Sequence, residues 1–282
     1  MTTTCTTIDE VRATVTAARG EGRRVALVPT MGALHSGHLA LVARAKEVAD
    51  LVVVSIFVNP MQFGPKEDFA RYPRDLDADR ALLDAAGADV VFAPDAAEVL
   101  PEGATQVRVA AGPVGDVLEG RVRPGHFDGV LTIVLKLLHI VGPDVAVFGQ
   151  KDAQQVFLVR RMLTDLDVPT ALEVVDILRE DDGLALSSRN RYLGVAERRL
   201  ARVVPGALDA AESFADRDVD AMVAAAQSVL AGEDGAELDY LAVVDPATFR
   251  PVDDGYRGRA LVLVAARVGG TRLIDNRFVH LG

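Results

Sequence analysis

The chain has 282 residues, half of them hydrophobic, and a formal net charge of −11. This length suits one large or two modest domains with a buried core, and no run of about 18 apolar residues is present that would predict a membrane-spanning helix. The negative charge disfavours DNA or RNA as the main partner, because nucleic-acid backbones attract basic surfaces.

The chain carries one cysteine, Cys5, which cannot form an internal disulfide. The first residues, MTTTCTTIDEV, have neither the basic start nor the apolar stretch of a secretion signal. Both features predict a soluble protein of the reducing cytoplasm. We expect no membrane and no nucleic acid among its partners.

The first part of the chain alternates apolar strands with helices. We expect strands at 24–30, 51–58, 89–93, 144–148 and 171–175. Helices are expected at 39–49, 76–86 after the capping residue Asp75, 130–141 and 153–166, with a polar loop at 59–72. This alternation predicts an α/β fold in which helices cover both faces of a parallel sheet.

The pattern changes after about Leu193. Two alanine-rich helices, 195–214 and 219–231, precede three strands at 238–244, 260–268 and 272–278. Helices followed by strands predict a separate small α+β domain. We therefore divide the chain into residues 1–186 and residues 187–282.

The stretch PTMGALHSGH, Pro29 to His38, follows the first strand and opens a helix. Ligands of open α/β sheets bind at this end of the strands, and Gly32 and Gly37 allow close approach of the backbone. His35 and His38 lie three apart at the helix start, where exposed amides and the helix dipole favour phosphate. A metal site, for which no third ligand is evident nearby, and a structural turn are the alternatives.

Two further polar stretches precede the helix expected at 130–141, which is called the central helix below. SIFVNPMQFG places Asn59 and Gln62 directly after a buried strand, where neutral amides can read hydroxyl and carboxylate groups; an Asn-Pro turn is the alternative. GRVRPGHFDGV, Gly120 to Val130, combines two arginines with His126 in a basic loop, or in an ordinary solvated loop. His139, on the polar side of the central helix, is expected at the surface.

The stretch FGQKDAQQ, Phe148 to Gln155, again lies at a strand end and opens a helix. Lys151 is a mobile point charge suited to phosphate. The side chains of Asp152, Gln154 and Gln155 can face the same crevice.

The stretch GLALSSRNRYL, Gly183 to Leu193, offers the hydroxyls of Ser187 and Ser188 and the guanidinium of Arg189, a set that often binds phosphate. Each of these stretches is a weak signal by itself. Three loops compatible with phosphate in an acidic protein, two of them at strand ends, are most simply explained by a nucleotide site.

Taken in chain order, these segments resemble the pantothenate synthetase family. The matching segments are PTMGALHSGH, similar to a His-x-Gly-His motif of adenylyl-transferring enzymes, SIFVNPMQF, Tyr72-Pro73-Arg74, RPGHFDGV, GQKD with the following glutamines, DGLALSSRNRYL and LVAARVGGTRLIDN. The resemblance implies condensation of pantoate with β-alanine to pantothenate through a pantoyl adenylate, with release of AMP and pyrophosphate and with magnesium accompanying ATP. It also implies a Rossmann-like domain over 1–186, a small lid domain over 187–282 and a cytoplasmic homodimer.

The resemblance also assigns residues. Those expected to border ATP are Met31, Gly32, Ala33, Leu34, His35, Ser36, Gly37, His38, Gly149, Gln150, Lys151, Asp152, Leu178, Leu186, Ser187, Ser188 and Arg189. Gln62 and Gln155 are expected to hold pantoate, Gln62 also to serve the β-alanine site, and Asn59 to lie close by. His38 takes the place of the proton donor. His35, His38, Lys151 and Arg189 would stabilise the pentacoordinate phosphate and the departing pyrophosphate.

One residue departs from the family pattern, which usually has Glu where this chain has Gln150. A neutral amide keeps hydrogen bonding but removes a charge beside Lys151. Two rival interpretations remain. Another adenylyl transferase, such as a nucleotidyltransferase or a tRNA synthetase fragment, is disfavoured by the acidic charge, and a non-catalytic nucleotide-binding regulator by the number of phosphate-compatible side chains.

Overall fold

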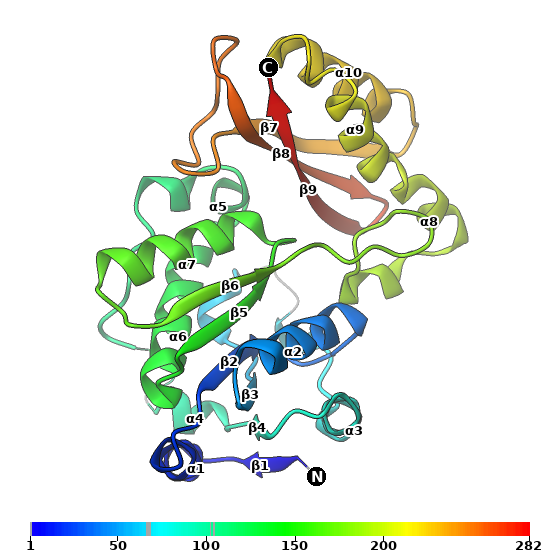
Figure 1. Cartoon of the computed structure of the whole chain (residues 1–282). Coiled ribbons are helices and arrows are strands. Elements are labelled where there is room, and N and C mark those ends of the chain that lie inside the picture. Colours follow the sequence, from blue (N-terminus) through cyan, green and yellow to red (C-terminus); the bar gives the residue numbers. More distant parts are fainter. Residues whose placement is uncertain (1, 66–68, 102, 104) are drawn as a thin grey trace. The chain divides into compact units, whose positions relative to one another are not determined.

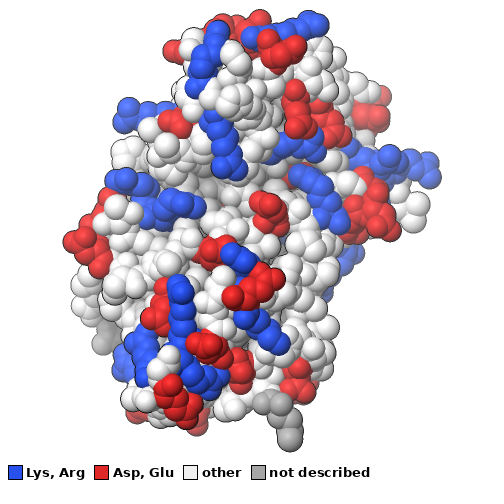
Figure 2. Space-filling model, in the orientation of Figure 1, with Lys and Arg blue, Asp and Glu red and all other residues white. Residues whose placement is uncertain are grey.

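The computed structural model describes residues 2–65, 69–101, 103 and 105–282. The chain forms two compact units, one of residues 1–150 with 158–175 and the other of residues 151–157 with 176–282. None of the helices in the described part of the chain has the length and apolarity that a membrane crossing requires. Over the face shown in Figure 2, Lys and Arg side chains are interspersed with Asp and Glu side chains.

The first unit is built on a parallel sheet (Figure 1), which has six strands among the described residues, in the order β1-β4-β3-β2-β5-β6. The strands are β1 (Thr3–Cys5), β2 (Val25–Thr30), β3 (Leu51–Ile56), β4 (Val90–Phe92), β5 (Val145–Gly149) and β6 (Ala171–Val175). From β2 the chain continues to β3 on one side, whereas from β5 it continues to β6 on the other. The paired strands β2 and β5 therefore form the topological switch point, where open α/β sheets bind ligands.

Helices cover both faces of this sheet. The helices along this part of the chain are α1 (Ile8–Gly20), α2 (Ser36–Val48), α3 (Leu76–Ala86), α4 (Ala96–Val99), α5 (Glu119–Val122), α6 (His126–Val141) and α7 (Ala153–Asp165), with short 3-10 turns η1 (Pro60–Gln62), η2 (Phe69–Arg71) and η3 (Pro113–Asp116). Residues 153–157 of α7 belong to the second unit. Side chains alternate along a strand, so Ala26, Val28 and Val52 face α2 while Leu27 and Val53, also fully buried, point to the opposite face. Helix α6 packs against β2 there, and α1 packs against α6.

The second unit contains an antiparallel sheet, three-stranded over the residues described, in the order β7-β8-β9. Its elements are η4 (Ser188–Tyr192), α8 (Val195–Ala201), α9 (Val203–Glu212), α10 (Val219–Ala231), β7 (Ala236–Val244), β8 (Gly258–Val268) and β9 (Thr271–Leu281). Helices α9 and α10 pack against one face of this sheet and bury a core of Ala, Val, Leu and Met side chains. The predicted fold class, a parallel α/β sheet followed by a small α+β part, is confirmed.

Two predictions about elements need correction. The single helix expected over 195–214 is two helices, α8 and α9, divided at Arg202. Pro205 has no backbone N–H, so the hydrogen bond that would continue the helix across this point is missing. The polar loop expected at 59–72 contains the turns η1 and η2, while residues 66–68 of it lie outside the described residues.

The division between the units falls after Val175, earlier than the expected boundary between residues 186 and 187. Leu184 is 2% exposed and belongs to the core of the second unit, with Ala201 and Leu208. The segment before Ser187 is therefore packed with the small α+β unit. The functions expected for the two parts stay predictions.

Candidate functional site

Three sequence-predicted loops of the first unit follow three neighbouring strands. The 31–38 loop follows β2, residues 57–62 follow β3, and Gln150 follows β5. Strand β2 pairs with both β3 and β5 in parallel, so the three loops leave the same edge of the sheet. The sheet thereby brings together the residues that the sequence predicted at strand ends in this unit.

The 31–38 loop has an unusual backbone conformation. Gly32 has φ +80° and Ala33 has φ +52°, both in the left-handed region. A Cβ on Gly32 would lie 2.7 Å from Oδ2 of Asp79 and 3.1 Å from Cγ2 of Ile56. Glycine is therefore required at position 32, because both the backbone angle and the space forbid a side chain.

The buried carboxylate of Asp79, on α3, holds this loop. Its Oδ2 accepts a hydrogen bond from the amide of Ala33 at 2.9 Å, and its Oδ1 accepts one from Leu34 at 2.8 Å. Asp79 is only 4% exposed, and two amide donors are the kind of partner that a buried charge needs. Asp79 thus fixes the path of the backbone that leads to His35.

His35 and His38 lie at the start of α2, with ring centroids 4.2 Å apart. The Nδ1 of His35 accepts from the amide of Gly37 at 3.1 Å, and the Nδ1 of His38 accepts from the amide of His35 at 3.3 Å. A neutral imidazole whose Nδ1 accepts carries its proton on Nε2. Both rings therefore have Nε2–H as their donor, at a helix end where the dipole favours anions.

The amide of Asn59 orients the amide of Gln62. Asn59 Oδ1 accepts from the amide of Met61 at 3.2 Å, and Asn59 Nδ2 donates to the carbonyl of Gly129 at 3.1 Å. These two backbone partners identify the oxygen and the nitrogen of the Asn59 side chain. The same Nδ2 donates to Oε1 of Gln62 at 3.1 Å. The Nε2 of Gln62 is then the donor of this amide, and it donates to the sulfur of Met31 at 2.9 Å.

The first turn of α6 packs directly against residues 61–62. A Cβ on Gly129 would lie 2.3 Å from the carbonyl oxygen of Met61 and 2.8 Å from the amide of Gln62. His126, which is 9% exposed, has its Nδ1 2.8 Å from the carbonyl of Gln62 and its Nε2 2.9 Å from Nη1 of Arg123. The stretch read as a possible solvated loop therefore contacts a predicted substrate-binding residue.

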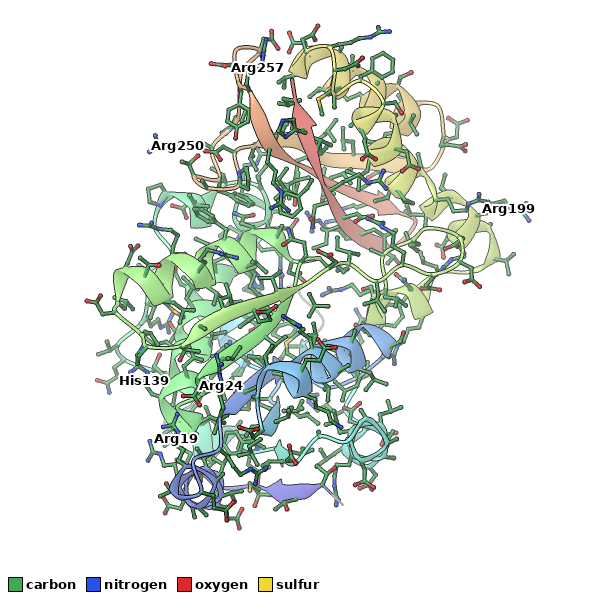
Figure 3. All side chains as sticks on the ribbon, in the orientation of Figure 1. Arg19, Arg24, His139, Arg199, Arg250 and Arg257 are labelled. Carbon is green, nitrogen blue, oxygen red and sulfur yellow. The ribbon has the colours of Figure 1, made fainter. Side chains whose placement is uncertain are left out.

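The segment after β5 is only partly exposed. The amide of Gln150 donates to the carbonyl of Val175 at 2.8 Å, and Gln150 is 8% exposed. The neutral residue that departs from the expected Glu is thus buried, where a charge would need a partner. His139, by contrast, is exposed and its Nδ1 lies 2.8 Å from the carbonyl of Leu135, as expected for a surface residue (Figure 3).

The other predicted residues lie in the second unit. Leu178 and Leu186 are joined by a backbone hydrogen bond of 2.9 Å, beside the bridge between Arg179 and Ala185. The hydroxyl of Ser187 accepts from the amide of Arg189 at 3.2 Å and so caps η4. Lys151 is half-buried, Asp152 is exposed and Gln155 is half-buried.

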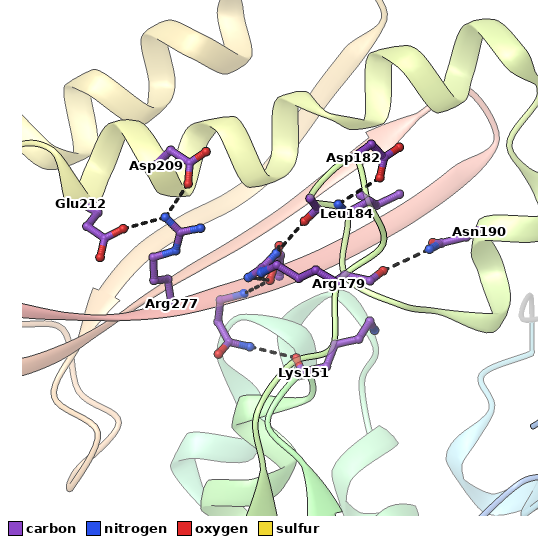
Figure 4. A network of polar contacts seen from close by, with 12 residues as sticks. Lys151, Arg179, Asp182, Leu184, Asn190, Asp209, Glu212 and Arg277 are labelled. Carbon is purple, nitrogen blue, oxygen red and sulfur yellow. Dashed lines mark hydrogen bonds and ion pairs between the residues drawn. The ribbon is translucent and has the colours of Figure 1, made fainter. Parts of the chain in front are cut away.

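A buried ion pair ties this segment to β9 (Figure 4). Arg179 donates from two nitrogens to the two oxygens of Asp275, at 2.6 and 3.0 Å, and the Asp275 side chain is 1% exposed. The next residue, Asn276, donates from Nδ2 to the carbonyl of Lys151 at 3.0 Å. The chain holding Lys151 and the chain leading to Ser187 therefore share one anchor on β9.

A second, more exposed set of ion pairs stabilises the same segment, residues 178–190. Arg198 donates to Glu180 and to Asp182, with shortest distances of 2.7 Å to each. These hydrogen bonds from Arg198 lower the pKa of Glu180 and of Asp182 below their ordinary values. Glu180 also accepts from Nδ2 of Asn190 at 2.7 Å, which connects the charges to η4.

The sequence alone did not single out Arg198, and it gave no role to Asp275 or Asn276, which end the LVAARVGGTRLIDN segment. It also gave no role to Asp77 or Asp79, two aspartates in the first turn of α3. The two carboxylates have opposite surroundings, since the Asp77 side chain is 97% exposed and Asp79 is buried. No group of three or more His, Cys, Asp or Glu side chains that could hold a metal ion occurs among residues 2–65, 69–101, 103 and 105–282. The available signal for Asp79 was its place in the first turn of a capped helix.

Comparisons with known proteins agree on one family. A sequence model of the family described as pantoate-beta-alanine ligase matches residues 3–278. The chain is 57% identical over 258 residues to a pantothenate synthetase of Leifsonia xyli subsp. xyli, covering 92% of this chain and 90% of that protein. It is also 57% identical over 275 residues to the pantothenate synthetase of Acidothermus cellulolyticus, covering 96% and 89%.

Solved structures give the same result. The pantothenate synthetase of Thermus thermophilus is 48% identical, with a TM-score of 0.91, and the match covers 98% of each chain. A pantoate-beta-alanine ligase of Francisella tularensis, described as complexed with beta-gamma ATP and beta-alanine, is 32% identical with a TM-score of 0.81, covering 98% of this chain and 97% of that one.

Proposed function

Because the chain belongs to the pantoate-beta-alanine ligase family, we propose that it is a ligase that condenses pantoate with β-alanine to pantothenate at the expense of ATP. The reaction proceeds through a pantoyl adenylate and releases AMP and pyrophosphate. The observation that carries the proposal is the placement of His35 and His38 at the start of α2, after a strand of the switch point, with the Nδ1 of each ring accepting from a backbone amide.

The first step activates a poor electrophile. A carboxylate resists attack by an amine because it is negative and lacks a good leaving group. A carboxylate oxygen of pantoate attacks the α-phosphorus of ATP, the bond to the bridging oxygen breaks, and pyrophosphate departs with the electron pair. His35 and His38 donate hydrogen bonds where negative charge grows, and His38 supplies the proton if pyrophosphate leaves protonated.

The second step transfers the acyl group. The neutral amine of β-alanine attacks the carbonyl carbon of the adenylate, AMP leaves with the electron pair of the broken acyl–oxygen bond, and the nitrogen releases a proton to solvent to give the amide. Neither step needs a covalent enzyme intermediate. The Nε2 of Gln62 suits an oxygen of pantoate, because Nε2 can only donate and its present acceptor, the sulfur of Met31, is a weak one, while Oε1 already accepts from Asn59.

Further residues are proposed from the motif resemblance. In the first unit Met31–His38, Gly149 and Gln150 contact ATP. In the second unit Lys151, Asp152, Leu178 and Leu186–Arg189 do so, and Gln155 contacts pantoate. Lys151 and Arg189 contribute positive charge toward the phosphates. The contacts of Asn59 support an indirect role, through Gln62.

Magnesium, a cytoplasmic location and a homodimer belong to the same proposal. Magnesium in nucleotide enzymes is commonly bound by substrate phosphates with one or two carboxylates, so a dedicated protein cage is not required. The ion would enter with ATP as part of the substrate. No step above depends on a protein ligand to it.

Turnover with pantoate, β-alanine and MgATP tests the proposal. We expect pantothenate, AMP and pyrophosphate in equal amounts, and a His38→Ala variant that folds normally but is slower by about 10²–10³, the usual cost of removing one transition-state donor. Product ADP in place of AMP, or a folded His38→Ala variant within a few-fold of wild type, would count against it.

A further inference from the structure

We propose that His126 is a positioning residue for pantoate, acting through the main-chain carbonyl of Gln62. The inference rests on the proposed function, in which the side chain of Gln62 contacts pantoate. His126 itself does not need to touch substrate.

The partners of His126 define its protonation. A carbonyl oxygen can only accept and a guanidinium can only donate. The Nδ1 of His126, 2.8 Å from the carbonyl of Gln62, must therefore donate, while its Nε2, 2.9 Å from Nη1 of Arg123, must accept. His126 is thus a neutral imidazole with its proton on Nδ1, the opposite tautomer to His35 and His38. Arg123 maintains this tautomer and also donates to the carbonyl of Gln62, at 3.4 Å.

The surroundings leave little room for adjustment. His126 is 9% exposed and begins α6, whose Gly129 admits no side chain against Met61 and Gln62. Gln62 is the last residue of η1, and the Asn59 side chain caps that turn. Gln62 is therefore held at three places: its backbone N–H by the turn, its backbone carbonyl by His126 and its side-chain Oε1 by Asn59.

This arrangement explains why a histidine serves at position 126. The remaining freedom of Gln62 is rotation of its main chain, which would swing Nε2 away from the direction that Asn59 sets. A donor pointed at the Gln62 carbonyl opposes that rotation. Losing it should weaken binding of the ligand that Nε2 contacts and leave nucleotide binding largely unchanged.

Two substitutions of similar polarity separate this role from simple packing. In His126→Asn the amide nitrogen can occupy the position of Nδ1 and keep the bond to Gln62, whereas in His126→Gln it lies nearer the position of Nε2 and cannot. We expect H126Q to raise the KM for pantoate about threefold to tenfold, the range for loss of one hydrogen bond, with the KM for ATP unchanged. H126N should stay within about twofold of wild type in both constants.

A double-mutant cycle sharpens the test. In a Gln62→Ala background, H126Q should cause no further rise in the KM for pantoate, because the side chain being positioned is gone. Arg123→Met, at a half-buried partner, gives a second variant if H126Q fails to fold, and it should show the same selective rise.

Equal KM values for pantoate in H126N and H126Q, a parallel rise in the KM for ATP, or full additivity with Gln62→Ala would overturn the inference while wild-type turnover remained normal. Wild-type turnover that did not depend on pantoate would instead overturn the proposed function, and this inference with it.

Discussion

The 31–38 loop of the first unit and the 178–190 segment of the second are held by different forces. The loop depends on a glycine backbone and on one buried carboxylate, Asp79, that accepts from two neutral amides. The segment depends on opposite charges, with Arg179 on Asp275 and Arg198 on two carboxylates. Shape and hydrogen bonding thus stabilise the first, while ionisation contributes strongly to the second. We expect the two to respond differently to substitution and to pH.

The largest loss of stability should come from breaking the buried ion pair of the second unit. Arg179→Met leaves the Asp275 carboxylate, 1% exposed, without its guanidinium. Removing one partner of a buried ion pair typically lowers the free energy of unfolding by about 3–5 kcal/mol. We expect a decrease near the lower end of this range, because the Arg179 side chain is 26% exposed. Urea unfolding would measure the change in free energy.

Arg277→Met is the matched control, because Arg277 lies on β9 two residues after Asp275 (Figure 4). Arg277 contacts Asp209 and Glu212, whose side chains are 64% and 53% exposed, so solvent can replace it. A loss of under about 1 kcal/mol is expected. A similar loss of stability in Arg179→Met and Arg277→Met would show that the burial of Asp275 does not add to the cost of removing its partner.

Asp79→Ala should have the next largest effect on stability. The amides of Ala33 and Leu34 would lose their acceptor inside the protein, at about 1–3 kcal/mol for each group left unsatisfied and somewhat less if water enters, so we expect about 2–4 kcal/mol. Because the loop leads to His35 and His38, adenylate formation should fall by about 10² or more, as misplaced catalytic groups commonly do.

Asp77→Ala, a change of the same type on the same helix, serves as the control for Asp79→Ala. Its side chain is 97% exposed and lies 3.8 Å from Arg80. Stability should stay within about 0.5 kcal/mol and activity should be unaffected. If Asp79→Ala behaved like Asp77→Ala, the loop would not depend on that carboxylate.

The smallest effect concerns pH. Hydrogen bonds from Arg198 lower the pKa of Glu180 and Asp182 from ordinary values of 4.5 and 3.8. Their stabilising contribution is therefore complete above about pH 4.5 and is lost as the pH falls through the lowered pKa values, because the unfolded chain then binds more protons. Wild type should lose more stability between pH 5 and about pH 3 than Arg198→Met, by under about 1 kcal/mol since the groups are half-exposed. Parallel stability curves would contradict this assignment.

Much of the fold could be predicted because the local signals agree with the tertiary structure. The helix over Leu76–Ala86 and the strand over Ala171–Val175 match the prediction at both ends, and the side chain of Asp75 caps the former as expected. Helix α1 was not predicted, although Thr7 and Glu10 form a capping box and Val11 and Val15 are buried at helical spacing. Strand β1, three residues long, is defined by its pairing with β4, which local sequence does not reveal.

Site residues could be predicted where they belong to a recognisable motif. The roles of side chains that contact a distant backbone group were harder to predict. His35, His38 and Gln62 stand in recognisable stretches at strand ends. Asp79, His126 and Asn276 act on the backbone of Ala33, Gln62 and Lys151, at sequence separations that only the folded chain closes. His126 and Asn276 lie in segments that the sequence analysis matched, but neither those segments nor the place of Asp79 on its helix shows which distant amide or carbonyl each side chain meets.

The order of the two chemical steps gives the most direct test of the proposed mechanism. If the adenylate forms before the amine attacks, the enzyme should exchange labelled pyrophosphate into ATP when supplied with MgATP and pantoate and no β-alanine. Omitting pantoate should stop the exchange, because its carboxylate is the nucleophile. Adding β-alanine should divert the adenylate to pantothenate and AMP. Exchange that required β-alanine would contradict the two-step order, and exchange supported by an amino acid without pantoate would contradict the proposed substrate.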